Sequence, residues 1–257
     1  MNKKNVLISI SSLLISPLAF ASGYTFLGPV AAATNVPEHI LAYSSVILLI
    51  FILGFAYRAK IAGMTKEQLV IPDEGLSLRN IVEFIGEKIY GLVDSVVGEA
   101  NAKKYFPLAV SIFILIFINN ILGLVPGIVP ATSNMNTTLA LGLFTFLYYN
   151  YQGIRAVGLV AHIKHLMGPV LWLAPLIFII EIISHVIRPM TLALRLRFNI
   201  EGDHLVLGTF TDLTYVIVPV VFLFLGTFIC FIQAFVFTIL SLVYVKLSIE
   251  SHDHDDH

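Results

Sequence analysis

The stretch RPMTLALRLRFNIEGDHLVL, Arg188–Leu207, places three arginines, a glutamate, an aspartate and a histidine in one of the most apolar parts of the chain. An ionisable side chain at membrane depth costs roughly 2.5–3.5 kcal/mol on insertion scales. Such residues normally face water or a charged partner, and they mark ion pathways. The stretch therefore predicts a membrane helix whose charges serve an ion path or a partner.

The composition of the whole chain is that of a polytopic membrane protein. Of its 257 residues, 58% are hydrophobic and only 12% are charged. A soluble domain needs more charge on its surface, so we expect one membrane bundle instead. The formal net charge of −1 gives no reason to expect nucleic acid as a partner. The single cysteine, Cys230, excludes an internal disulfide and, within an apolar run, favours inert packing.

The N-terminus has the pattern of a secretory signal peptide. Two lysines precede an apolar stretch over residues 6–20, and small residues at Ala19 and Ala21 fit a cleavage site. An uncleaved first helix is the alternative. The predicted organisation is a signal peptide at 1–21, a single membrane domain at 22–250, and a solvated HDHDDH tail at 251–257, for which metal binding is the alternative.

Five segments predict membrane helices, because a bilayer core about 30 Å thick requires about 20 apolar residues. The segments are Ile40–Tyr57, Phe106–Val125, Leu139–Tyr149 with extensions on both sides, Pro169 to about His204, and about Leu213 to Leu247. Residues 74–100 differ, since their apolar residues recur at helical spacing opposite a charged face. They predict an amphipathic helix at the membrane interface, with a soluble linker helix as the alternative. The expected fold class is all-α.

Basic residues predict the orientation. They are concentrated between Arg58 and Lys104 and recur at Arg155, Lys164 and Lys246, whereas residues 126–136 contain none. The positive-inside rule then places the mature N-terminus outside and the C-terminus in the cytoplasm. The fourth segment would be on the order of 50 Å long as a helix, which exceeds the bilayer. We expect it to form a tilted antiparallel hairpin with the last segment, with the turn at Thr209–Thr214.

Helical spacing divides the polar residues of the fourth segment into two stripes. One stripe holds Glu181, Ser184, Arg188, Arg195 and Asn199, and the other holds Arg197, Glu201 and His204. Within these stripes Arg188 can pair with Glu181, and Arg197 with Glu201. Arg195 has only another arginine at one-heptad spacing, and a guanidinium stays protonated. We therefore expect its negative partner on another chain, or water around it.

Polar residues outside this segment have two possible roles. Asn119 and Asn120 end the second span, and Asn134 and Asn136 open the third. Helix-end capping and the lining of an outer aqueous vestibule both fit these positions. In the last segment Gln233 is the polar residue at membrane depth.

Three motifs together resemble subunit a of the F-type ATP synthases: RPMTLALRLRFN, then GDHLVL, and QAFVFTILSLVYV near the end. Their order and spacing agree with that family over most of the chain after residue 21. The resemblance implies a stator subunit in a bacterial inner membrane, beside a ring of c subunits and the peripheral-stalk subunit b. It implies no cofactor and no catalytic chemistry on this chain, which contains no phosphate-binding G-x-x-x-x-G-K-S/T loop.

The resemblance also implies roles for single residues. Arg195 falls on the family's essential arginine, which faces the c-ring carboxylates and separates two offset half-channels. Asn199 and Gln233 match polar residues near that arginine. The other matches are Glu181 and Ser184 in the cytoplasmic half-channel, Arg188 at a basic position, Asn120 and Pro126 at the end of an earlier span, and Asp203 or His204 as the outer relay, on a path that Asn134 and Asn136 also line.

The chain departs from the family pattern in two places. The family usually reads R-L-F-G-N, whereas this chain reads R-L-R-F-N from Arg195 to Asn199. Arg197 lies about 200° around the helix from Arg195, so it does not compete for that face. Gly226 stands where some relatives carry a histidine or glutamate.

Two other function classes predict features that this sequence can be compared with. A self-contained secondary transporter or channel would show internal repeats, and none is convincing. An intramembrane metalloenzyme could use His185, Asp203 and His204, but their spacing is not that of metal ligands and no H-E-x-x-H is present.

Overall fold

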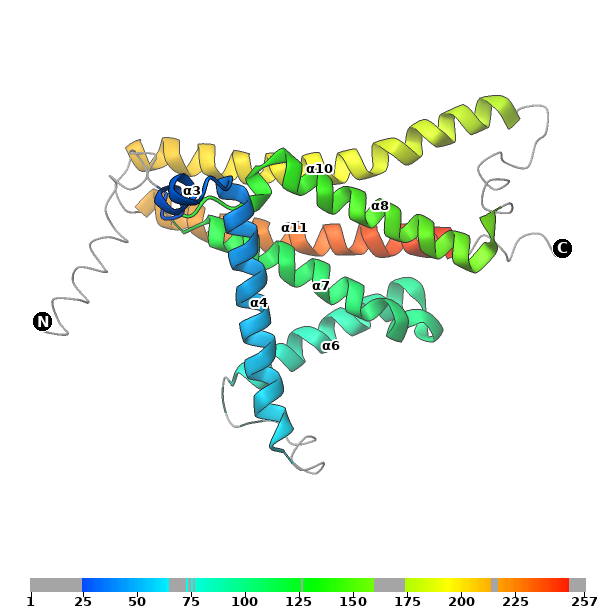
Figure 1. Ribbon diagram of the computed structural model, residues 1–257, viewed down its shortest axis with the longest axis horizontal. Coiled ribbons are helices and arrows are strands. Elements are labelled where there is room, and N and C mark those ends of the chain that lie inside the picture. Colours follow the sequence, from blue (N-terminus) through cyan, green and yellow to red (C-terminus); the bar gives the residue numbers. More distant parts are fainter. Residues whose placement is uncertain are drawn as a thin grey trace, which may run out of the picture. The chain divides into compact units, whose positions relative to one another are not determined.

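The computed structural model describes residues 25–64, 73, 75, 77–125, 127–159, 174–213 and 217–249. Every regular element in these ranges is helical, which confirms the all-α prediction (Figure 1). The predicted signal peptide, Pro126 and the HDHDDH tail lie outside the described residues. The elements are α3 (Gly28–Thr34), α4 (Glu38–Ala62), α6 (Leu78–Val97), α7 (Glu99–Gly123), the 3-10 helix η1 (Ala131–Ser133), α8 (Met135–Val157), α10 (Ala174–Leu213) and α11 (Ile217–Ile249).

Four of these helices are long and apolar enough to cross a membrane, namely α4, α7, α10 and α11. They coincide with four of the five predicted spans. Helix α8 contains the remaining one and has 23 residues, or about 34 Å at 1.5 Å per residue. It carries more polar side chains, such as Asn150 and Gln152, so its crossing of the membrane stays a prediction. Helix α6 matches the predicted amphipathic segment, whose position at the interface also stays a prediction.

The described helices pack into two compact units. Unit 1 comprises the chain up to residue 46 together with 116–138 and 194–233. Unit 2 comprises residues 47–115, 139–193 and 234 onward. Each of the four long apolar helices contributes one part to each unit.

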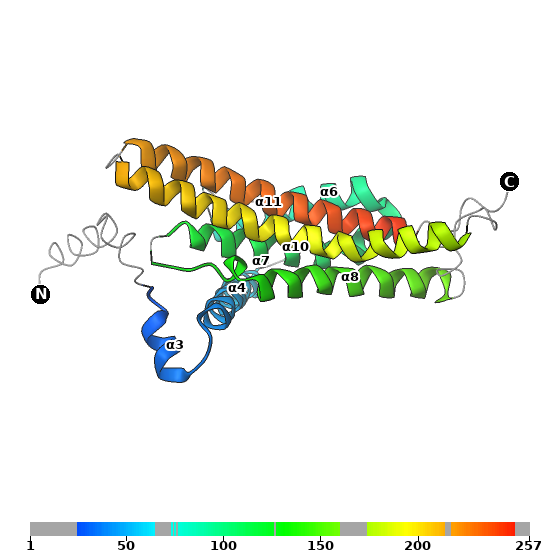
Figure 2. The same cartoon turned by 90° about the horizontal axis from the view of Figure 1, so that it is seen from above.

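In unit 1 the C-terminal part of α10 and the N-terminal part of α11 run side by side (Figures 1 and 2). Leu196, Ile200 and Leu207 bury one face of α10, and the Cys230 thiol of α11 is buried as expected. The predicted turn at Thr209–Thr214 is wrong for most of its residues, because α10 continues to Leu213. The Thr209 hydroxyl donates to the Leu205 carbonyl at 2.8 Å. Such a bond satisfies the hydroxyl of a threonine that lies inside a helix.

In unit 2 helix α8 packs closely against α10. A Cβ atom added to Gly142 would lie 2.7 Å from the carbonyl oxygen of Pro189, so only glycine allows this approach. Pro189 lies inside α10. It has no N–H to donate to the preceding turn of that helix. The two helices therefore meet immediately after Arg188.

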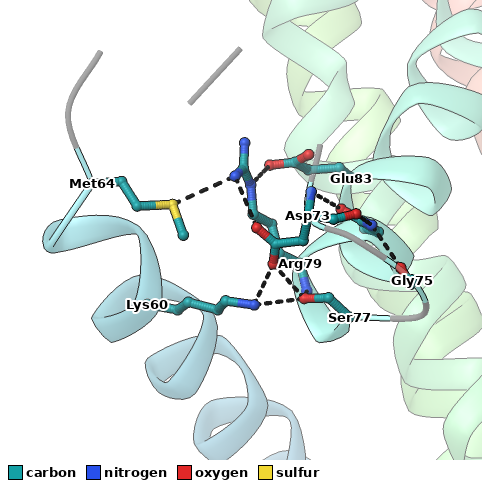
Figure 3. Close-up of polar contacts among 8 residues, drawn as sticks. Lys60, Met64, Asp73, Gly75, Ser77, Arg79 and Glu83 are labelled. Atoms are coloured by element: carbon teal, nitrogen blue, oxygen red, sulfur yellow. Dashed lines mark hydrogen bonds and ion pairs between the residues drawn. The ribbon is translucent and has the colours of Figure 1, made fainter. Parts of the chain in front are cut away.

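A polar cluster in unit 2 joins the end of α4 to the beginning of α6 (Figure 3). Lys60 pairs with the Asp73 carboxylate and donates to the Ser77 hydroxyl at 2.6 Å. Arg79, only 1% exposed, pairs with Asp73 at 3.3 Å and with Glu83 at 2.7 Å. Hydrogen bonds from Lys60 and Ser77 lower the pKa of Asp73 to about 2. The carboxylate therefore stays ionised near neutral pH and holds the cluster together.

Candidate functional site

The centre of the predicted site lies in unit 1, where α10 faces α11. The Asn199 Nδ2 donates to the Gln233 Oε1 at 2.5 Å. Gln233 is 3% exposed, and Asn199 is half-buried. The sequence placed both residues near the site, and the structure brings their amides into direct contact. The Asn199–Gln233 hydrogen bond is thus the polar centre of the α10–α11 pair, where the facing surfaces of the two helices are otherwise apolar.

An open groove of about 450 Å³ lies beside this amide pair. Its lining is Phe198, Asn199, Gly202, Asp203, Ile229 and Ile232. Asp203 supplies a carboxyl group to this groove, and Asn199 supplies an amide that also belongs to the pair. The groove therefore brings the Asp203 carboxyl group close to the polar centre of the α10–α11 pair.

Of the two candidates for the outer relay, only Asp203 lines this groove. His204 is half-buried. It follows Asp203 by one residue and therefore lies about 100° further round α10, on the side of the helix that carries Arg197. Which of the two residues acts as the relay stays a prediction.

Arg195 lies one turn before Asn199 on α10 and is exposed. Among the residues that the structure describes, no hydrogen bond or ion pair reaches its guanidinium. Arg197, two residues on, behaves differently, since its Nε lies 3.4 Å from the Glu201 carboxylate. The predicted Arg197–Glu201 pair is therefore confirmed, and Arg195 keeps a positive charge without a counter-charge in the described part of the chain.

The asparagines of the second and third spans hold the connection between α7 and α8. Asn119 Oδ1 accepts the Ala131 N–H at 3.1 Å, and Asn120 Oδ1 accepts the Thr132 hydroxyl at 3.0 Å. Both asparagines are at most 3% exposed. Their amide oxygens therefore fix η1 from the end of α7, and lining of a path by Asn120 stays a prediction.

Asn134 has the capping role that was one of its two predicted alternatives. Its Oδ1 accepts the backbone N–H of Asn136 at 2.9 Å, at the beginning of α8. Its Nδ2 lies 3.3 Å from the Nδ1 of His39 on α4. The Asn136 side chain is exposed. Capping explains Asn134 without a vestibule, whereas a path role for either residue is not tested.

Gly226 lies close to the Leu124 side chain. A Cβ atom at this position would lie 3.0 Å from the Leu124 Cδ2, within unit 1. A histidine or glutamate there would require Leu124 to move. Leu124 is a flexible side chain that can shift by that amount, so this contact alone does not explain the departure from the family pattern.

The second group of predicted site residues lies in unit 2. Arg188 Nη2 donates to Glu181 Oε1 at 3.0 Å, which confirms that predicted pair. The same guanidinium lies 5.6 Å from the ring centroid of Tyr244 on α11. Ser184, which lies between Glu181 and Arg188 in the sequence, is half-buried. Tyr244 was not predicted, because nothing in its apolar surroundings distinguishes it from a packing aromatic.

Sequence reasoning also missed a contact between His185 and Asn150. The His185 Nε2 lies 3.0 Å from the Asn150 Oδ1 of α8. The sequence signal for this contact was an asparagine in the aromatic run from Tyr148 to Tyr151.

Among the described residues no three His, Cys, Asp or Glu side chains could hold a metal ion together. The metalloenzyme alternative therefore has no site in that part of the chain.

Comparison with known proteins agrees with the motifs. Residues 40–246 match the family described as ATP synthase A chain. An ATP synthase subunit a from Bdellovibrio bacteriovorus is 50% identical over 202 residues, or 79% of this chain and 86% of that protein. The subunit a of Sorangium cellulosum is 38% identical over 232 residues, or 90% of each chain. That of Helicobacter hepaticus is 41% identical over 211 residues, or 81% of this chain and 90% of that protein.

Proposed function

This chain belongs to the ATP synthase A chain family, and from that premise we propose that it is the membrane stator subunit of an F-type ATP synthase. In this role it passes protons to and from the carboxylates of a c-ring through two half-channels, with Arg195 between them. The observation that carries the proposal is the exposed Arg195 guanidinium, which has no counter-charge in the described residues. A c-ring carboxylate supplies that charge.

The outer half-channel includes the groove of unit 1. A proton reaches Asp203, passes the Asn199–Gln233 amides and protonates a ring carboxylate. The neutral acid can then face lipid, because its charge, which made lipid exposure costly, is gone. His204, Asn120, Asn134 and Asn136 belong to the approach to this groove.

Arg195 prevents a direct leak between the two paths. A guanidinium and a carboxylate about 4 Å apart attract by about 4 kcal/mol at an effective dielectric constant of 20. This attraction favours the deprotonated ring carboxylate as it passes Arg195. The carboxylate must therefore release its proton before it reaches the arginine and regain one after it.

The inner half-channel runs past Ser184 and Glu181 to the cytoplasm. Arg188 is neutralised by Glu181 at 3.0 Å, so it does not compete with Arg195 for the ring carboxylate. The membrane potential supplies about 2.3 kcal/mol per charge per 100 mV. We place the chain in a bacterial inner membrane, with its mature N-terminus outside, its C-terminus in the cytoplasm, and subunit b as a further partner.

The test is to purify the tagged chain from its own membranes and to reconstitute it. We expect it to co-purify with a c-ring and subunit b, and the complex to acidify vesicles when ATP is added. The chain alone should not transport ions in liposomes. Ion transport by the isolated chain would overturn the proposal in favour of a self-contained transporter.

A further inference from the structure

Tyr244 of α11 is a partner of Arg188 that the half-channels described above do not use. Its ring centroid lies 5.6 Å from the Arg188 guanidinium carbon, within the range in which a ring face attracts a cation. Arg188 in turn donates to Glu181 at 3.0 Å. The side chains of Arg188 and Glu181 are only 28% and 34% exposed, so water screens these contacts incompletely. The guanidinium therefore has an ionic partner on α10 and an aromatic partner on α11.

The Tyr244 ring is itself held in place within unit 2. It packs on the ring of Tyr149 of α8, with the two centroids 5.7 Å apart. Tyr149 is buried, and its carbonyl accepts the Ser248 hydroxyl of α11 at 2.6 Å. This hydrogen bond joins α8 to α11 one turn after Tyr244. The aromatic ring that Arg188 meets is thus packed against a buried ring, which restricts the positions open to it.

Arg188 needs such a contact because its position on α10 leaves its direction open. It lies midway between Glu181 and Arg195, seven residues from each. Seven residues span about 10.5 Å along a helix, which is longer than the one-turn spacing at which helical side chains usually pair. The flexible arginine side chain can extend toward either end of α10. A contact from another helix selects one direction, and Tyr244 supplies such a contact.

Helical spacing relates Tyr244 to the polar centre of the α10–α11 pair. On α11, Tyr244 follows Gln233 by eleven residues. On α10, Arg188 precedes Asn199 by eleven residues. Eleven residues are close to three helical turns, so the two residues on each helix share one face of that helix. Tyr244 therefore lies on the face of α11 that carries the Asn199 partner.

We propose that Tyr244 is a positioning residue of the inner half-channel, whose ring holds the Arg188 guanidinium against Glu181. The proposal rests on the proposed function of the chain. Held in this direction, Arg188 stays clear of the c-ring carboxylate that Arg195 attracts. Without the aromatic ring, the guanidinium is free to extend toward Arg195 and to compete for that carboxylate. The attraction requires only the ring face, so the Tyr244 hydroxyl takes no part.

The test uses the complete membrane sector in inverted vesicles stripped of the soluble ATPase sector. Proton uptake is driven by a potassium diffusion potential, with co-purified c-ring as the assembly control. We expect Y244L to slow uptake about fivefold, the rate change that corresponds to one cation–π contact. Y244F keeps the ring and should keep the wild-type rate. Y90L is the matched control and should also keep it, because Tyr90 is a half-buried tyrosine of the same unit that meets the ring of Phe106.

A double variant separates positioning from packing. R188Q removes the cation, so Y244L should cause no further slowing in that background, whereas a packing role of the ring would slow both backgrounds equally. Y244M covers the case in which Y244L does not assemble, since methionine fills irregular space without the quadrupole of an aromatic ring.

Three results would overturn the inference. They are a wild-type rate in the aliphatic variant that assembles, a loss in Y244F equal to that variant's loss, and additive slowing when the variant is combined with R188Q. The proposed function fails on a different result, namely wild-type proton uptake in R195A, which is measured in the same vesicles.

Discussion

Arg188 and Arg195 are seven residues apart on α10, yet their surroundings are opposite. Arg188 is held by the Glu181 carboxylate at 3.0 Å and lies over the ring of Tyr244. Arg195 is exposed and meets no counter-charge among the described residues. An arginine is thus neutralised within the chain at position 188, whereas the arginine at position 195 has no counter-charge among the described residues. The difference is the presence of a local carboxylate at Arg188 and its absence at Arg195, and under the proposed function a partner supplies the missing charge.

The other paired arginines support this interpretation. Arg197 pairs with Glu201 at 3.4 Å, and the buried Arg79 contacts both Asp73 and Glu83. These three pairings use carboxylates no more than seven residues away. Among the described residues Arg195 has no such acid, as is also the case for Arg58 and Arg155, but those two lie near the ends of α4 and α8. The following substitutions test whether the missing acid matters at Arg195.

The largest effect is expected at Arg195. R195A removes the charge that faces the ring, so coupled pumping should fall below detection while the complex still assembles. ATP-driven acidification of inverted vesicles measures the change, with co-purified c-ring as the assembly control. Normal coupled pumping in R195A would contradict this prediction, because the unpaired charge of Arg195 would then have no role that distinguishes it from Arg188.

Removal of the counter-charge of Arg188 should have a smaller effect. E181Q leaves a partly buried guanidinium unpaired and removes a carboxylate from the inner path, so pumping should slow several-fold without being lost. The double variant E181Q/R188Q restores neutrality and should assemble better than E181Q alone, since an uncompensated partly buried charge is costly. A wild-type rate in E181Q would exclude Glu181 from the proton path.

A packing substitution at Gly142, next to Pro189, tests whether the close approach of α8 to α10 beside Arg188 stabilises unit 2. G142A places a Cβ atom 2.7 Å from the Pro189 carbonyl oxygen, which should destabilise unit 2 by about 1–3 kcal/mol. G54A is the matched control, because a Cβ atom at Gly54 meets nothing within 4 Å. Both changes gain the same helix propensity. Equal thermal stability of the two variant complexes would show that the close approach of α8 to α10 does not contribute to stability.

The sequence was informative where partners are local along one helix. Charge spacing of four and seven residues predicted the Arg197–Glu201 and Arg188–Glu181 pairs, and hydrophobic length predicted the long helices. Contacts between helices were not accessible in this way. Asn199 and Gln233 were placed near each other only by resemblance, because 34 positions separate them and helix packing decides which side chains meet.

Two misses have different causes. The His185–Asn150 bond spans 35 positions, and no periodicity relates α8 to α10. The turn at Thr209–Thr214 was predicted only from the expected hairpin of the last two segments. In the structure Thr209 bonds to the preceding helical turn instead, so α10 extends to Leu213.

The smallest effect is expected at Arg197, which sharpens the comparison because it lies only two residues from Arg195. Its ion pair with Glu201 is at 3.4 Å, with 33% and 47% of the two side chains exposed. Such i,i+4 pairs contribute about 0.3–0.5 kcal/mol. R197Q should therefore reduce pumping less than about twofold, and E201Q should match it, because each removes the same weak pair. A loss in R197Q as severe as in R195A would show that proximity to the ring, and not the missing counter-charge, distinguishes these arginines.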